Sequence, residues 1–364
     1  MKIKEITDYL EGLAPLSSQE SYDNCGLIIG GADKEVNGVL VSLDCIESTV
    51  EEAIRLGVNM IVAHHPIVFS GLKKINGKNY IERTILKAIK NDVAIYAIHT
   101  NFDNYNYGVN DEIGQRLKLK DLRVLAPKKG VLTKLACFVP IDSVDHVSDA
   151  MFNAGAGSIG DYAECSFRST GTGTFMPMNG ANPVVGELGK RQSESEFRLE
   201  VLVSNHLLEQ VVMAMKNAHP YEEVAYEMFA ILNENQTEGA GMIGELENPV
   251  DELEFLEFVK TTFDCGVIRH TNLLGRKIER VAFCGGAGSF LLNQAKRADA
   301  DIFITGDFKY HEFFDSENQI VIADIGHFES EQFTSDKLAA ILTKKFPKFA
   351  VHLTKINTNP INYF

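Results

Sequence analysis

Short apolar runs alternate with amphipathic segments over the first third of the chain. Apolar residues recur at helical spacing over 48–56 and 80–91, which predicts two helices. Compact runs rich in β-branched residues predict strands at 39–43, 60–63 and 93–98. Strands that alternate with helices favour a largely parallel or mixed sheet that is covered on both faces.

The last third repeats this rhythm. Its apolar runs and amphipathic segments predict, in chain order, a strand at 281–284, a helix at 290–297, strands at 301–304 and 320–324, and a helix at 330–342. Because polar residues follow the strands in both outer thirds, we expect the two to build one discontinuous α/β domain. We assign it residues 1–127 and 239–364, with an α/β/α-layered architecture.

The middle of the chain has a different order of elements. The pattern predicts a strand at 135–139, a helix at 144–153, strand-like residues on both sides of 171–173, a strand at 197–203, a helix at 207–217 and a strand at 224–232. The order β-α-β-β-α-β is typical of the ferredoxin-like fold. We therefore expect an inserted α+β domain over 128–238.

Composition narrows the class of protein. A length of 364 residues suits two domains, and a formal net charge of −15 disfavours nucleic acid and anionic membranes as partners. We find neither an apolar leader nor the run of roughly 20 apolar residues that a membrane-spanning helix needs. The six cysteines lie far apart without a Cys-x-x-Cys pair, so we expect reduced, mostly buried thiols in a cytoplasmic protein.

Candidate metal ligands follow three of the predicted strands. His64 and His65 come directly after the strand at 60–63, and Asp103 lies past the end of the next strand. His327 and Glu331 are four residues apart where a strand leads into a helix, so both can lie on one helical face. Because ligands collect at the carboxyl ends of strands in open α/β sheets, the set predicts a two-metal hydrolase site.

Each signal has a plainer explanation when it stands alone. A His-His-Pro sequence after a strand also suits a turn, and a His-x-x-x-Glu spacing is common. Their shared placement on strand ends favours the metal site over these explanations. Imidazole and carboxylate ligands suit zinc, iron or manganese, and the sequence leaves the choice among the three open.

Further polar residues lie near the candidate ligands. His99 is four residues before Asp103, and Asp307 and His311 follow the strand at 301–304. These residues can orient metal ligands or shuttle protons, and His99 and His311 are the candidate catalytic groups. Capping and turn formation are the alternative roles. The glycine-rich stretch 284–289 lacks the Lys-Ser/Thr of a phosphate-binding P-loop, so close backbone packing explains it better than anion binding.

Longer motifs resemble those of a known family. They are Asp23-Asn24-Cys25-Gly26-Leu27, Ala63-His64-His65-Pro66, His99-Thr100-Asn101-Phe102-Asp103, Thr305-Gly306-Asp307 with His311, and Gly326-His327-Phe328-Glu329-Ser330-Glu331. With them the whole chain resembles the NIF-three-like family, whose bacterial members are called GTP cyclohydrolase 1 type 2 homologues. The middle segment resembles the PII-like insert of the longer members in Gly171-Thr172-Gly173-Thr174-Phe175 and Ala218-His219-Pro220-Tyr221-Glu222-Glu223.

The resemblance implies a set of metal ligands and an assembly. The dinuclear ligands would be His64, His65, Asp103, His327 and Glu331, with Glu331 bridging. The assembly would be a homohexameric toroid whose openings the PII-like inserts cap. The cyclohydrolase name concerns opening of the guanine imidazole ring, a reaction that needs an activated water and a proton donor.

Two functions follow from these expectations. The first is a metal-dependent hydrolase that acts on a nucleotide or related small molecule through a metal-activated water. The alternative is a metal-binding regulatory or metabolite-sensing ring protein without catalytic turnover.

Overall fold

The computed structural model describes residues 1–364 and divides into two compact units. One unit joins Met1–Pro127 to Thr237–Phe364, and the other spans Lys128–Gln236. We place the second boundary at 238 from the sequence, and the structure places it two residues earlier. That boundary falls inside a continuous strand, β10 (Glu234–Val250), so no loop marks it in the sequence.

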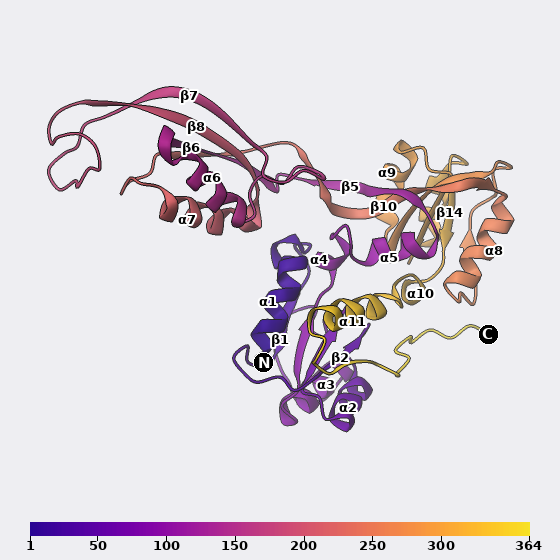
Figure 1. The fold of residues 1–364 in the computed structure, drawn as a ribbon. Helices are drawn as coiled ribbons and strands as arrows, with labels where there is room; N and C mark the ends of the chain where they lie inside the picture. The colour runs from indigo at the N-terminus through magenta and orange to yellow at the C-terminus, as the bar shows by residue number, and fades with distance from the viewer. The chain divides into compact units, whose positions relative to one another are not determined.

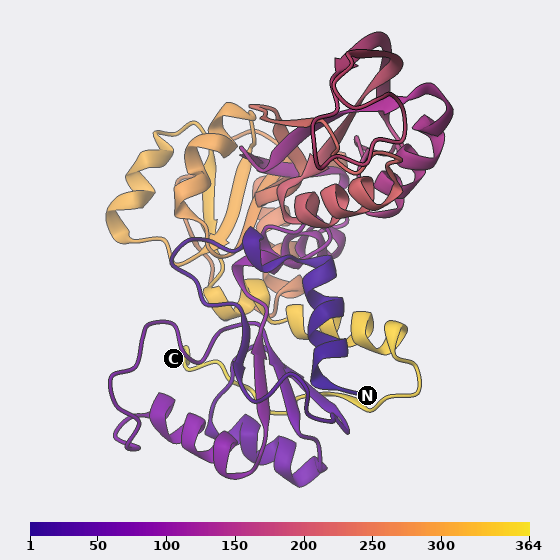
Figure 2. The same cartoon turned by 90° about the vertical axis from the view of Figure 1, so that its left-hand side faces the viewer.

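The first unit contains two sheets, and the first of them has five strands in the order β1-β4-β3-β2-β15. The strands are β1 (Gly26–Ile29), β2 (Val39–Ser42), β3 (Met60–Ala63), β4 (Ala94–Ala97) and β15 (Val351–Leu353). All neighbours are parallel except β1 and β4. Figure 2 shows the yellow C-terminal segment beside the purple strands, where β15 pairs with β2.

The second sheet has six strands in the order β11-β14-β13-β12-β10-β5. Besides β10, they are β5 (Lys120–Lys129), β11 (Arg269–His270), β12 (Ile278–Ala287), β13 (Ile302–Gly306) and β14 (Val321–Asp324). The central strands β12, β13 and β14 are parallel, and antiparallel partners flank them. Both sheets are therefore mixed, which confirms the expectation of a largely parallel or mixed sheet and divides it between two sheets.

The helices of this unit follow from apolar faces and from caps. They are α1 (Ile3–Leu13), α2 (Glu47–Leu56), α3 (Tyr80–Lys90), α4 (Thr100–Asp103), α5 (Val109–Arg116), α8 (Glu252–Thr262), α9 (Leu292–Arg297), α10 (His327–Glu331) and α11 (Thr334–Lys345). Asn79 caps α3 by accepting a hydrogen bond from the Glu82 amide, and Asp251 caps α8 in the same way. No helix is long and apolar enough to span a membrane.

A shared apolar core joins the two sheets. Met60 and Val62 of the first sheet belong to the same buried cluster as Phe283 and Ile304 of the second. Residues of α1, α5, α8 and α11 complete this cluster. The opposite face of the first sheet packs against α2 and α3, and the opposite face of the second packs against α9. The two distant stretches of sequence therefore fold as one unit.

The sequence prediction of one helix over 330–342 is wrong. The structure has two helices, α10 and α11, with Gln332 and Phe333 between them. The side-chain amide of Gln332 donates hydrogen bonds to the carbonyl oxygens of Phe263 and Glu329, outside the regular helical ladder. The break ends α10 just after Glu331, and α11 begins at Thr334.

The inserted unit has the order of elements that the sequence predicts. Its strands β6 (Leu132–Pro140), β7 (Ser166–Phe175), β8 (Gln192–Ser204) and β9 (Tyr226–Ala230) form an antiparallel sheet in the order β7-β8-β6-β9. Figure 1 shows α6 (Val144–Asn153) and α7 (Leu208–Ala218) on one side of this sheet. Their apolar residues pack on Leu135, Cys137 and Leu199. The other sheet face carries no helix of this unit.

All six cysteines are free thiols, as expected. Four of them are buried, and Cys25 and Cys165 are partly exposed. Burial raises the pKa of Cys137 to about 12, so this thiol stays protonated at neutral pH. The four buried cysteines therefore act mainly as small apolar residues.

The shared core provides a stability test. Phe283 is fully buried between the sheets, whereas Phe314 is 66% exposed. We expect Phe283→Ala to lower the free energy of unfolding by about 3–5 kcal/mol because it opens a cavity. Phe314→Ala should change it by less than about 0.5 kcal/mol. Chemical denaturation of both variants measures the difference, and equal losses would contradict the shared core.

Candidate metal site

Parallel strands from both sheets end at one cavity of about 580 Å³. Strands β2, β3 and β4 lead to Asp44, His65 and His99, and strands β13 and β14 lead to Asp307 and His327. The carboxyl ends of the two sets of strands therefore face a common space. This is the edge at which α/β proteins place their ligands.

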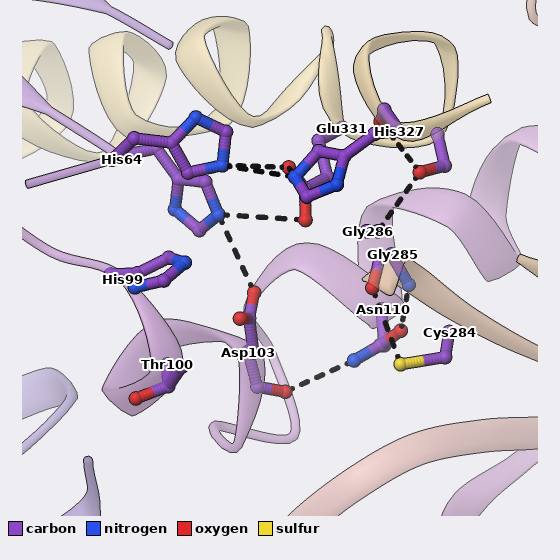
Figure 3. A network of polar contacts seen from close by, with 12 residues as sticks. His64, His99, Thr100, Asp103, Asn110, Cys284, Gly285, Gly286, His327 and Glu331 are labelled. Carbon is purple, nitrogen blue, oxygen red and sulfur yellow. Dashed lines mark hydrogen bonds and ion pairs between the residues drawn. The ribbon is translucent and has the colours of Figure 1, made fainter. Parts of the chain in front are cut away.

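Glu331 lies at the centre of the cluster and is only 2% exposed. Its Oε2 atom is 3.0 Å from His65 Nε2 and 3.1 Å from His327 Nε2. Its Oε1 atom lies on the other side, 3.8 Å from His64 Nε2 (Figure 3). The two carboxylate oxygens thus face two different sets of side chains.

His64 and Asp103 form the second set. His64 Nε2 is 3.5 Å from Asp103 Oδ1, and both atoms are buried without a hydrogen-bond partner. Buried polar atoms are rarely left in this state, and a cation between them would satisfy both. The donor atoms therefore fit a divalent metal ion.

Three groups of side chains bring possible ligand atoms within 4.8 Å of one another. One contains His65, His327 and Glu331, another contains His64, Asp103 and Glu331, and the third contains His64, His65 and His99. The five predicted metal ligands therefore lie together, with His99 beside them. Imidazole nitrogen and carboxylate oxygen are ligands that zinc, iron and manganese accept.

Each histidine of the cluster is oriented through its Nδ1 atom. The Nδ1 atom of His64 lies 2.8 Å from the Ile98 carbonyl oxygen, that of His65 lies 2.8 Å from Asp44 Oδ1, and that of His327 lies 2.7 Å from Asp307 Oδ2. These oxygens only accept, so Nδ1 carries the hydrogen and donates it. The lone pair of the neutral ring then sits on Nε2, directed at the cluster, as in metal-ligating histidines.

The charged side chains of the site shift one another's pKa values. Burial lowers the pKa of His65, but hydrogen bonds to Asp44 and Glu331 outweigh it and raise that pKa to about 10. The charge of Glu331 raises the pKa of His327 to about 11, against the effect of burial. Burial raises the pKa of Asp103. Protons and metal ions therefore compete for the same Nε2 atoms.

The glycine-rich stretch packs against Glu331. A side chain on Gly286, whose φ is +62°, would run into the Glu331 carboxylate. The amide N–H groups of Gly285 and Gly286 donate to Asn110 Oδ1 and Ser330 Oγ, at 3.0 and 2.9 Å. Because protein atoms already satisfy these donors, the stretch positions Glu331 instead of forming an anion cradle.

The three secondary candidates differ in their placement. His99 lines the cavity, and its Nδ1 atom donates to Asp23 Oδ1 at 2.8 Å. Asp307 orients His327 through the contact described above. His311 is exposed, does not line the cavity, and stacks edge-on against Tyr310 with ring centroids 5.2 Å apart. The cluster therefore includes the first two and not His311.

Sequence reasoning assigned no role to several residues of the site. Asp44 directly follows a predicted strand, so the rule that found His64 applies to it as well. Asp23 occurs in a motif of the resemblance, but its spacing does not indicate that it contacts His99. The C-terminal tail gives no periodic signal, yet Thr358 donates to Asp44 and Asn359 lines the cavity.

The contact between Asp44 and His65 can be tested directly. We expect Asp44→Ala to weaken zinc binding by about 10–100-fold, because His65 Nδ1 loses its acceptor and the ring loses its orientation. Competition of the chelator-treated protein with a chromophoric chelator measures this affinity. Asp315→Ala removes an exposed carboxylate and should leave the affinity unchanged. Equal affinities for all three proteins would refute the orienting role.

The raised histidine pKa values predict the pH dependence of stability for chelator-treated protein. The unfolded histidines titrate near pH 6.5, whereas folded His65 and His327 titrate at about 10 and 11. Their contribution to stability is therefore complete below about pH 6.5 and is lost as the pH rises toward 10. Urea denaturation from pH 6.5 to 10 should show this decline. His327→Gln should flatten it, and His146→Gln, at an exposed position, should not.

Comparison with known proteins agrees with the resemblance found in the sequence. The profile of the family described as Duf34/NIF3 (NGG1p interacting factor 3) matches residues 1–360. A protein of Halalkalibacterium halodurans named GTP cyclohydrolase 1 type 2 homolog is 39% identical over 363 residues, which cover 98% of each chain. The Bacillus subtilis protein of the same name is 36% identical over 367 residues, covering 99% of this chain and 98% of that protein.

Solved structures agree with the sequence comparison. A Bacillus cereus protein related to NIF3 superposes with a TM-score of 0.88 and 37% identity, covering 100% of this chain and 99% of that one. A Staphylococcus aureus protein superposes with a TM-score of 0.79 and 29% identity over the same shares. The resemblance is confirmed, and the chain belongs to the Duf34/NIF3 family.

Proposed function

We propose that this protein binds two divalent metal ions and hydrolyses a small molecule, a nucleotide or a related heterocycle, with their help. The observation that carries the proposal is the division of the Glu331 carboxylate between two ligand sets. His64 and Asp103 would hold one ion with Oε1, and His65 and His327 would hold the other with Oε2. A shared carboxylate of this kind is common in two-metal hydrolases.

The ions, whether zinc, iron or manganese, would supply Lewis acidity and lower the pKa of a water bound to them. The chain supplies proton transfer through His99. Burial raises the pKa of Asp23, but hydrogen bonds from His99 and Thr100 outweigh it and hold that pKa well below its usual value. The ionised Asp23 fixes the hydrogen on His99 Nδ1 and leaves Nε2 to accept or donate a proton. His311 lies outside the cavity and has no part in this scheme.

The cavity suits a flat heterocycle. Tyr22, Phe69 and Phe290 line it while remaining at least half exposed, and the Tyr22 and Phe69 rings lie 6.1 Å apart. Aromatic side chains in this position can stack on a base. The name of the curated relatives, GTP cyclohydrolase 1 type 2 homolog, points to the same substrate class.

The domain assignments belong to the same proposal. We assign the dinuclear site to the discontinuous α/β/α-layered domain and a PII-like, ferredoxin-like fold to the insert. The insert's strand order, β7-β8-β6-β9, and its two helices on one face support that fold. The homohexameric toroid and the cytoplasmic location stay predictions from the resemblance and the composition.

Glu331→Gln tests the hydrolase proposal. We expect zinc-, iron- or manganese-loaded protein to turn over at least one member of a panel of nucleotides and phosphoesters. The variant should reduce this turnover to the rate without protein, because it removes the charge that both ligand sets share. Glu317→Gln, at an exposed position, should retain the activity.

The outcomes separate the two functions. Activity that survives Glu331→Gln would contradict the proposed site. A wild-type protein that binds two metal ions per chain but turns over no substrate would favour the regulatory alternative. Metal analysis of each variant is therefore measured beside its activity.

A further inference from the structure

The inserted unit has a cavity of its own, of about 410 Å³. All its lining residues lie within Lys128–Gln236. They come from β6, from the end of β7, from β8, from the loop at 176–185 and from the segment after α7. The Asn182 amide donates to Glu222 Oε1 at 2.8 Å and so ties this loop to that segment. This hydrogen bond fixes two walls of the cavity relative to each other.

The carboxylate of a buried residue, Glu196, faces this cavity. Glu196 lines it and is 8% exposed, and its oxygens open onto the cavity without a hydrogen bond or ion pair to the chain. Its carboxylate lies against Gly173, where a side chain would collide with it. A carboxylate with so little access to water is stabilised when a donor or a cation enters the cavity and binds to it.

The surroundings offer no counter-charge from the chain. Glu222 and Glu223 also line the cavity, and its walls contain no lysine, arginine or histidine. Arg198 is close by on β8, but it is paired with Glu200 and Glu227. Burial and the nearby Glu194 raise the pKa of Glu196. A positively charged ligand would stabilise the ionised carboxylate of Glu196 against both burial and the charge of Glu194.

The remaining walls are aromatic and apolar. Phe138, Phe175 and Tyr221 line the cavity, and the rings of Phe175 and Tyr221 are 6.1 Å apart. Aromatic faces beside a carboxylate attract organic cations. A divalent metal ion fits less well, because it needs several converging oxygen ligands. The groups of three ligand atoms within 4.8 Å of one another all lie at the His64–Glu331 cluster.

We propose that the insert cavity binds a small organic cation, an amine or guanidinium on an apolar or aromatic body. The charged group donates hydrogen bonds to Glu196. The apolar body lies against Phe175 and Tyr221. The site is independent of the metal ligands and of any hydrolytic activity.

Titration of the full-length protein with phenethylammonium chloride, followed by saturation-transfer NMR, tests the proposal. We expect saturable binding with a Kd of about 1 mM or tighter. Phenethyl alcohol, the neutral isostere, should bind at least about tenfold more weakly, since it lacks the charge. Glu196→Gln should weaken binding of the ammonium by about tenfold or more and leave binding of the alcohol unchanged.

Control variants separate the site from general effects. Glu187→Gln makes the same charge change at an exposed position that does not line the cavity, so the affinity should stay within about twofold. Gly173→Ala should also weaken binding, because the added methyl group displaces the Glu196 carboxylate. Thermal melting shows whether each variant folds, and Glu196→Asp retains the charge if Glu196→Gln does not fold.

Three results would overturn the proposal. They are the absence of saturable binding to the wild type, equal affinity for the ammonium and the alcohol, and undiminished ammonium binding by Glu196→Gln. Sedimentation velocity measures the oligomeric state and so tests whether a second copy of the chain occupies the cavity. A wild type that binds no probe, combined with a Glu196→Gln variant that loses an oligomeric state, would assign the cavity to a contact between copies of the chain.

Discussion

The buried carboxylate of Glu331 is the constraint on which the rest of the site depends. A carboxylate that is 2% exposed is stable only when cations or donors surround it. Its partners are 266 residues away at His65 and only four away at His327. The carboxyl ends of the two sheets must therefore meet, and the shared core of Met60, Val62, Phe283 and Ile304 holds them together. Gly285 and Gly286 contribute by letting the backbone of β12 approach the carboxylate.

A second layer of oxygen atoms determines what this cluster can bind. Asp44, Asp307 and the Ile98 carbonyl each hold one histidine by its Nδ1 atom, so the Nε2 atoms converge. Without bound cations, the histidine pKa values rise and the burial of Asp103 resists its ionisation. The histidines therefore carry protons that a divalent metal ion would displace, so metal binding depends on pH.

The insert also contains an acidic residue with little access to water, but different side chains lie around it. Glu196, like Glu331, is a buried acidic residue, but the cavity it lines has aromatic walls, whereas histidines contact Glu331. Imidazole nitrogens and a second carboxylate favour a metal ion, whereas aromatic faces favour an organic cation. Each compact unit of the chain thus has a cavity lined by a carboxylate, and we propose that the two cavities take cations of different kinds.

The sequence by itself determined most of the regular elements and the five candidate ligands. Apolar periodicity located α2, α3 and the central strands of both sheets, because local spacing encodes which face is buried. Position after a strand selected His64, His65, Asp103 and His327 for the same local reason. Only the tertiary structure decided that Asp23 and Asp44 orient histidines, that the tail after β15 returns to the cavity, and that His311 lies outside it. These are contacts between residues far apart in the chain, or directions of single side chains. Neither produces a periodic pattern of apolar residues in the sequence. The break between α10 and α11 is of the same kind, since the Gln332 bond to Phe263 spans 69 residues.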